Sequence, residues 1–155
     1  MKNINLSQYP STRMRRLRKT RAIRELVEET SLNVNDLIYP VFITDKNSSE
    51  NIELMPDIKR LCMHDLMQTA EKLVSIGIHA IALFPVIDKK YKSNNGEEAY
   101  KSDGLIQKTI AKLKSEFPEL IVITDVALDP YTSHGHDGVI INNQIDNDET
   151  IKILT

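Results

Sequence analysis

Three short apolar runs rich in β-branched residues recur along the chain at nearly constant spacing. They occupy residues 37–44, 80–87 and 120–126, and they begin near residues 37, 79 and 120, which gives spacings of 42 and 41 residues. Between them, residues 64–76 and 104–117 carry apolar side chains at helical spacing. Strand, helix and strand repeated at a fixed interval are typical of parallel βαβ units. The sequence therefore predicts an α/β protein with about three parallel βα units.

The segments between these elements are predicted from their polar residues and breakers. The expected segments are a helix over 21–29, a polar loop over 45–51, an irregular connection over 55–60, a mobile surface loop over 88–102 and a hairpin or strand extension over 139–145. Asp103 and Asn147 are the expected amino-terminal caps of the two later helices. Pro40 lies inside the first apolar run, and because proline cannot donate a ladder hydrogen bond we expect an edge or a locally unpaired position there.

The amino-terminal segment differs in composition from the rest. Six of the seven arginines lie between Arg13 and Arg24, whereas the whole chain has a net charge of -2. We expect residues 1–20 to form a basic arm and residues 21–155 to form one domain. A basic run can attract nucleic acid, but no aromatic residue for base stacking is interleaved here, so no nucleic-acid partner is predicted.

Cysteine content and hydropathy bear on the compartment. Cys62 is the single cysteine, so it cannot form an internal disulfide, and a reducing compartment is the natural setting. No apolar stretch approaches the roughly 18 residues of a membrane-spanning helix. We therefore expect a cytoplasmic protein without a membrane partner.

The polar loop that follows the third apolar run carries the candidate chemistry. It holds Asp125, Asp129, Tyr131, Ser133, His134, His136 and Asp137, with turns at Gly135 and Gly138. Ligands of α/β proteins bind beyond the carboxyl ends of the strands, which is where this loop begins. Three carboxylates that converge there repel one another, so they would hold a cation, share a proton or bind an ammonium group. A structural alternative is an Asx-type turn at Asp129, with the histidines hydrogen-bonded to loop backbone.

The same loop resembles the site loop of porphobilinogen synthase, also called 5-aminolevulinate dehydratase. The matching segment, TDVALDPYTSHGHDG, covers residues 124–138. Further blocks of the family occur in the same order: RMRRLRK, RELVEET, DLIYPVFIT, MPDIKR, AIALFPVI, DGLIQ and NDETIKIL. The resemblance covers essentially the whole chain but only the first half of the family pattern. It implies a partial (β/α)8 TIM barrel, since a complete barrel needs about 250 residues.

The resemblance also implies an activity and the residues that serve it. Family members condense two 5-aminolevulinate molecules to porphobilinogen in tetrapyrrole and haem biosynthesis. Asp125 would act on the substrate amino group as the catalytic carboxylate. The implied substrate-binding residues are Asp129, Tyr131, Ser133, His134, His136 and Asp137. The family reaction uses two Schiff-base lysines on later strands, and this chain has no lysine of that character, so we predict that the chain alone is inactive.

Metal and oligomer expectations follow from the same resemblance. Many family members place zinc-binding cysteines where this chain has Ala127, Asp129 and Asp137. Without thiolates we expect no zinc, and the remaining oxygens of Asp129 and Asp137 suit a hard cation such as Mg2+. The resemblance further implies a homo-oligomer, an octamer in the complete family member, in which the basic arm wraps a neighbouring subunit.

Two other functions compete with this interpretation. The chain could be a non-catalytic half-barrel that associates with full-length subunits through its arm and its open sheet edge. The loop of aspartates and histidines could instead form a self-contained divalent-metal hydrolase site. The second alternative is weak because the sequence has no HExxH or comparable spacing.

Overall fold

A computed structural model describes residues 15–155, which fall into two compact units with a boundary between Asn33 and Val34. The described part of the first unit contains η1 (Arg16–Arg18) and α1 (Arg21–Leu26). The Oγ1 of Thr20 caps α1 by accepting a hydrogen bond from the amide of Ile23 at 3.2 Å. Helix α1 ends earlier than the helix predicted over 21–29. Residues 1–14 of the expected basic arm lie outside the described residues, and the domain boundary at residue 20 stays a prediction.

The second unit is built on a five-stranded sheet with the order β2-β3-β1-β4-β5. The strands are β1 (Ile38–Thr44), β2 (Glu50–Ile52), β3 (Met55–Leu61), β4 (Ala80–Val86) and β5 (Ile121–Thr124). Strand β1 is parallel to β4 over seven register pairs, and β4 is parallel to β5. The three predicted apolar runs are therefore confirmed as adjacent parallel strands.

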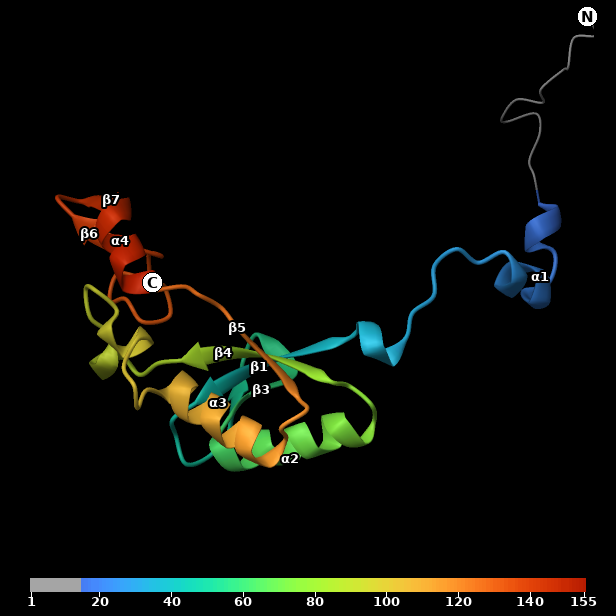
Figure 1. Cartoon of the computed structure of the whole chain (residues 1–155), viewed down its shortest axis with the longest axis horizontal. Helices are drawn as coiled ribbons and strands as arrows, with labels where there is room; N and C mark the ends of the chain where they lie inside the picture. Colours follow the sequence, from blue (N-terminus) through green and yellow to red (C-terminus); the bar gives the residue numbers. More distant parts are fainter. Residues whose placement is uncertain (1–14) are drawn as a thin grey trace, which may run out of the picture. The chain divides into compact units, whose positions relative to one another are not determined.

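Both long helices cover the same face of this sheet (Figure 1). Helices α2 (Met63–Ser75) and α3 (Leu105–Glu116) turn Leu66 and Leu113 inward, against Ile81 and Leu83 of β4. These four side chains are at most 1% exposed, as expected for a close-packed core. The core therefore lies between the sheet and the α2–α3 layer.

Within residues 34–155 no helix covers the opposite face of the sheet, and its side chains are partly exposed. Ile38, Phe84, Ile121 and Ile123 alternate with the core residues along their strands and are 38–56% exposed. Strand β5 forms one edge of the sheet, which confirms the predicted open edge after the third strand. The apolar run of β5 is therefore buried on one face only, at Leu120, and exposed on the other.

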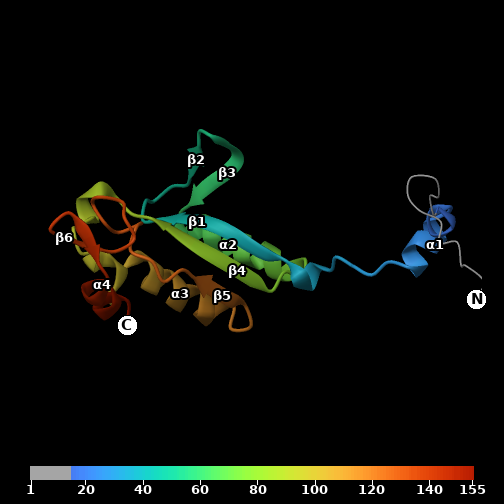
Figure 2. The ribbon, with the colours of Figure 1, turned by 90° about the horizontal axis from the view of Figure 1, so that it is seen from above.

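The segment between β1 and α2 differs from its prediction. Residues 45–49 are irregular, as predicted, but Glu50–Ile52 and the expected irregular connection over 55–60 form an antiparallel hairpin, β2 and β3, whose far end projects from the rest of the sheet (Figure 2). Strand β3 pairs with β1 only at Phe42 and Ile43, so Pro40 has no partner on that side although β1 is a central strand. The locally unpaired position predicted for Pro40 is therefore confirmed, and the edge position is not.

Two predicted caps are displaced by one residue. Gly104 stands at the amino-terminal cap of α3 without a side-chain bond, while the Asp103 carboxylate pairs with Lys101 at 3.6 Å. Asp146 rather than Asn147 caps α4 (Asn147–Leu154), because its Oδ1 accepts from the amide of Glu149 at 3.0 Å. The predicted hairpin over 139–145 is confirmed as β6 (Val139–Ile141) and β7 (Gln144–Asp146).

Within the described part of the chain, no helix has the length and apolarity required to cross a bilayer.

Candidate functional site

The loop after β5 is held in shape by its own backbone and by one carboxylate. The Oδ1 of Asp137 accepts a hydrogen bond from the amide of Leu128 at 2.7 Å, which ties the two limbs of the loop together. The amides of Tyr131 and Thr132 both donate to the carbonyl of Leu128, at 2.8 and 2.9 Å, and close a tight turn. The Leu128 side chain is fully buried. The loop therefore packs against the rest of the protein and has a defined conformation.

A second loop, residues 88–102, is fastened to this one. The amide of Ser93 donates to the carbonyl of Tyr131 at 3.2 Å, and the amide of Ser133 donates to the carbonyl of Ser93 at 2.8 Å. Gly96 has φ +65, and a Cβ there would contact the side chains of Tyr131 and Leu128 at 3.4 and 3.5 Å. The segment predicted as a separate surface loop is therefore paired with the candidate site loop, as parallel bridge geometry at Ser93 and Thr132 also shows.

The structure brings three of the predicted site residues to one cavity of about 480 Å³. Asp125, Asp129 and Tyr131 line this cavity, which we call the aspartate cavity, beside the rings of Phe42 and Phe84. Those two rings belong to the open face of the sheet and lie 6.1 Å apart. The expected position beyond the carboxyl end of β5 is therefore where the cavity lies.

The other four predicted residues do not line the aspartate cavity. Asp137 binds the Leu128 amide, as described above. The Nδ1 of His134 accepts from the amide of His136 at 3.1 Å, and its Nε2 lies 3.2 Å from the carbonyl oxygen of Asn94. Ser133 contributes its backbone to the Ser93 bridge. For His134 the structure matches the alternative in which a histidine organises loop backbone, and the three expected carboxylates do not all converge.

The surroundings of Tyr131 displace its pKa. Its side chain is 7% exposed. Burial, with a smaller contribution from the negative charge of Glu98, raises the pKa of Tyr131 to about 12. A phenol is protonated at neutral pH with or without this shift, so the Tyr131 hydroxyl can donate a hydrogen bond inside the cavity.

Lys92 also lines the aspartate cavity, and the sequence did not single it out. The sequence placed all four lysines of 88–102 in solvent. The sequence does not show that Ser93 pairs with Thr132. Because of this pairing, the neighbouring Lys92 lies beside the cavity that Asp125 and Asp129 line. In the described residues, no ion pair within 4.0 Å involves Lys92, Asp125 or Asp129.

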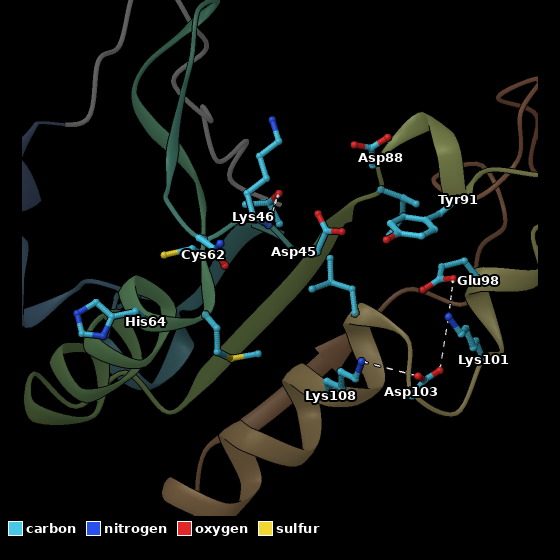
Figure 3. Close-up of a pocket in the computed structure, with 15 residues that line it drawn as sticks. Asp45, Lys46, Cys62, His64, Asp88, Tyr91, Glu98, Lys101, Asp103 and Lys108 are labelled. Atoms are coloured by element: carbon cyan, nitrogen blue, oxygen red, sulfur yellow. Dashed lines mark hydrogen bonds and ion pairs between the residues drawn. The ribbon is translucent and has the colours of Figure 1, made fainter.

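A second cavity, of about 490 Å³, lies near the carboxyl ends of β1, β3 and β4 (Figure 3). Its three lysines are all ion-paired: Lys46 with Glu50, Lys101 with Glu98 and Asp103, and Lys108 with Asp103. The Asp103 and Glu98 carboxylates raise the pKa of Lys101. We call this second cavity the paired cavity, because each of its lysines already has a carboxylate partner. The Lys92 ammonium of the aspartate cavity has none among the described residues.

The donor set does not fit the Mg2+ site expected at Asp129 and Asp137. Asp129 lines the cavity, whereas Asp137 is committed to the Leu128 amide. Over residues 15–155 no group of three His, Cys, Asp or Glu side chains is arranged to hold a metal ion. We therefore derive no chemical step through a metal at these residues.

Comparison with known proteins shows the family of this chain. The family model for delta-aminolevulinic acid dehydratase matches residues 11–155. The chain belongs to the delta-aminolevulinic acid dehydratase family. It is 46% identical over 149 residues to the dehydratase of Methanothermus sociabilis, covering 96% of this chain and 46% of that protein. It is 39% identical to the dehydratase of Chlamydia pneumoniae, covering 99% of this chain and 46% of that protein.

A solved dehydratase structure agrees with the fold described above. The crystal structure of the Toxoplasma gondii dehydratase, in complex with its reaction product porphobilinogen, matches with a TM-score of 0.89 and 45% sequence identity. The match covers 92% of this chain and 41% of that chain. The resemblance and the partial barrel predicted from the sequence are confirmed, and the chain spans less than half the length of these dehydratases.

Proposed function

We propose that this chain provides the amine-binding part of a porphobilinogen synthase site, in an enzyme that condenses two molecules of 5-aminolevulinate to porphobilinogen with loss of water. The observation that carries the proposal is the aspartate cavity. It combines Asp125 and Asp129, which have no counter-ion among residues 15–155, with the hydroxyl of Tyr131 and a partly apolar wall. Membership of the dehydratase family supports the substrate, because it is the substrate from which the family takes its name.

The two aspartates would bind the substrate ammonium group and accept a proton from it. A 5-aminolevulinate ammonium group would pair with Asp125 and Asp129, whose charges have no cation within ion-pair distance among the described residues. Asp125 stands at the end of β5 and would accept the proton that the ammonium must lose before its nitrogen can act as a nucleophile. Tyr131 would donate a hydrogen bond to a substrate oxygen and fix its orientation.

The remaining predicted residues would act through the loop. Asp137, His134 and the Ser133 backbone hold the segment that carries Asp129 and Tyr131. The two carbonyl-capturing lysines of the family would come from strands that this chain does not contain. We therefore expect the 155-residue chain to bind substrate weakly and to form no porphobilinogen by itself.

A turnover assay and a trapping experiment test this proposal together. The purified chain is incubated with 5-aminolevulinate, with and without Mg2+, and porphobilinogen is measured colorimetrically. No product is expected, and borohydride treatment should leave no covalent adduct in the mass spectrum. Porphobilinogen formation, or a reduced imine on this chain, would contradict the division of roles.

An Asp125 variant tests the binding role separately. Asp125→Asn keeps the shape of the side chain and removes its charge, so it should weaken 5-aminolevulinate binding by about tenfold, as for loss of a charge-assisted hydrogen bond. Asp148→Asn, on the exposed first turn of α4, is the matched control and should bind as the parent does. Equal affinities for both variants would remove Asp125 from the site.

A second candidate function rests on the uncovered side of the sheet. Ile121, Ile123 and Phe84 leave an apolar surface beside the open β5 edge, which suits association with full-length dehydratase subunits. The basic segment around Arg16 and Arg18 would add contacts, in line with the homo-oligomer expected for the family. Light scattering of the chain mixed with a complete dehydratase tests this, and failure to co-migrate counts against it.

The cytoplasmic location also stays a proposal. Cys62 is buried and carries no disulfide, which suits a reducing compartment. Fractionation of the source cells checks it.

A further inference from the structure

The four lysines of residues 88–102 have different surroundings. Lys101 is paired with Glu98 and Asp103, and the ammonium of Lys90 lies 4.7 Å from the centre of the Tyr91 ring. Lys89 is exposed and lines neither cavity. Lys92 alone of the four lines the aspartate cavity, and it forms no ion pair with a described residue.

The backbone around Lys92 is fixed with respect to the two aspartates. The amide of Lys92 donates to the carbonyl of Lys89 at 3.2 Å and closes the turn of η3 (Lys89–Tyr91). The next residue, Ser93, is hydrogen-bonded on both sides to the loop that carries Asp129. The backbone of Lys92 is therefore held beside the aspartates by three backbone hydrogen bonds.

The aspartate cavity thus presents one cation and two anions that do not neutralise one another. In the paired cavity, by contrast, each lysine lies within 4.0 Å of a carboxylate. Unpaired charges of both signs in one cavity are complementary to a ligand that carries both an ammonium and a carboxylate. A ligand with only one of these groups would leave one of the protein charges without a partner.

We infer that Lys92 is a specificity-determining residue that binds the carboxylate of the substrate while Asp125 and Asp129 bind its ammonium group. The inference rests on the proposed function, since it assigns the other end of the same substrate. It makes the cavity selective for short zwitterionic amino acids over simple amines and simple acids. Lys92 acts here as a charged ammonium and not as a nucleophilic amine.

The experiment compares three ligands on the complete 155-residue chain by NMR titration. They are 5-aminolevulinate, its methyl ester, which keeps the ammonium and masks the carboxylate, and levulinate, which keeps the carboxylate and lacks the amine. Lys92→Met preserves the length of the side chain and removes its charge. It should weaken 5-aminolevulinate and levulinate by about tenfold, the loss expected for one charge-assisted hydrogen bond, and leave the ester unchanged.

Two further variants make the result specific. Lys89→Met removes an equal charge from the same loop and should leave all three affinities unchanged. Asp129→Asn should weaken 5-aminolevulinate and its ester and spare levulinate. Urea midpoints of all variants, measured in parallel, should match that of the parent because the three side chains are not in the core.

The outcomes separate the inference from the function on which it rests. If Lys92→Met binds 5-aminolevulinate as the parent does while Asp129→Asn still loses affinity, the role of Lys92 is wrong and the amine site stands. If the parent chain binds neither 5-aminolevulinate nor its ester, the proposed function fails as well. Borohydride reduction that attaches the ligand covalently to Lys92 would also overturn the inference, because it requires a neutral, nucleophilic amine.

Discussion

The two faces of the sheet differ in what they contribute. On the helix side, Leu83 and Ile81 are at most 1% exposed and pack beneath α2 and α3. On the opposite side, the adjacent Phe84 is 39% exposed, and Ile121 is 56% exposed. The covered face supplies the buried area that stabilises the fold. The open face leaves apolar side chains exposed, and the aspartate cavity lies beside them.

This difference shows how a parallel sheet can be stable and still leave a site accessible. Each strand places alternate residues on opposite faces, so a single strand serves both purposes. Phe42 and Phe84 point to the open face and line the cavity, whereas Ile43 and Ile81 are part of the core and do not line it. Stability and binding should therefore respond separately to substitutions at adjacent positions.

The largest expected effect comes from comparing Leu83→Ala with Phe84→Ala. Leu83→Ala should lower the free energy of unfolding by about 2–5 kcal/mol, because it leaves a cavity in a close-packed core. Phe84→Ala removes a larger side chain but should cost only about 1 kcal/mol, since much of the ring is already in water. Urea denaturation followed by circular dichroism measures both. Equal losses would show that the open face is covered in solution.

A smaller effect is expected from Tyr131 at high pH. Its folded-state pKa of about 12 lies above the unfolded value near 10, so the unfolded chain ionises first and binds fewer protons. Stability should therefore be unaffected at pH 8 and should fall between pH 10 and 12, by about 1 kcal/mol after allowance for screening by solvent and salt. Urea midpoints at pH 8 and 11.5 measure the loss.

Tyr131→Phe is the control for this titration, and it should remove the extra loss of stability above pH 10. In a spectroscopic titration of the native protein at 295 nm, the late-ionising phenol should also disappear from the five tyrosines of the parent. A parent whose tyrosines all ionise near pH 10 would show that the site loop does not bury Tyr131.

The smallest change in stability is expected from Ile121→Thr combined with Ile123→Thr. Threonine keeps the β-branched shape that suits a strand, and Ile121 and Ile123 are already 56% and 38% exposed, so the free energy of unfolding should change by less than about 0.5 kcal/mol. Self-association, measured by sedimentation velocity, should nevertheless decrease, because the apolar surface beside the open edge is reduced. Unchanged association would mean that another surface joins the copies.

The fold could largely be predicted because its strongest signals are local and periodic. The runs at 37–44, 80–87 and 120–126 became three adjacent parallel strands. The β2–β3 hairpin could not be predicted, because its strands extend into solvent and their polar residues show no buried face. Asp103 fits a cap by composition, but three-dimensional ion pairing with Lys101 uses its carboxylate instead.

The candidate site could be predicted in place but not in detail. The carboxyl end of the third strand was indicated by the change from apolar to polar residues at Asp125. Sequence alone could not decide which loop side chains face the cavity and which bind backbone, so Asp137 and Asp129 looked equivalent. Lys92 was missed because its surroundings depend on the pairing of Ser93 with Thr132, two segments about forty residues apart.

The Ser93–Thr132 bridge has a consequence for the thermodynamics of binding. It joins the segment that carries Lys92 to the segment that carries Asp129, which restricts the motion of one relative to the other. A ligand that spans them meets a preorganised frame and loses little affinity to the ordering of loops. Flexible loops of similar composition would have to be immobilised at each binding event.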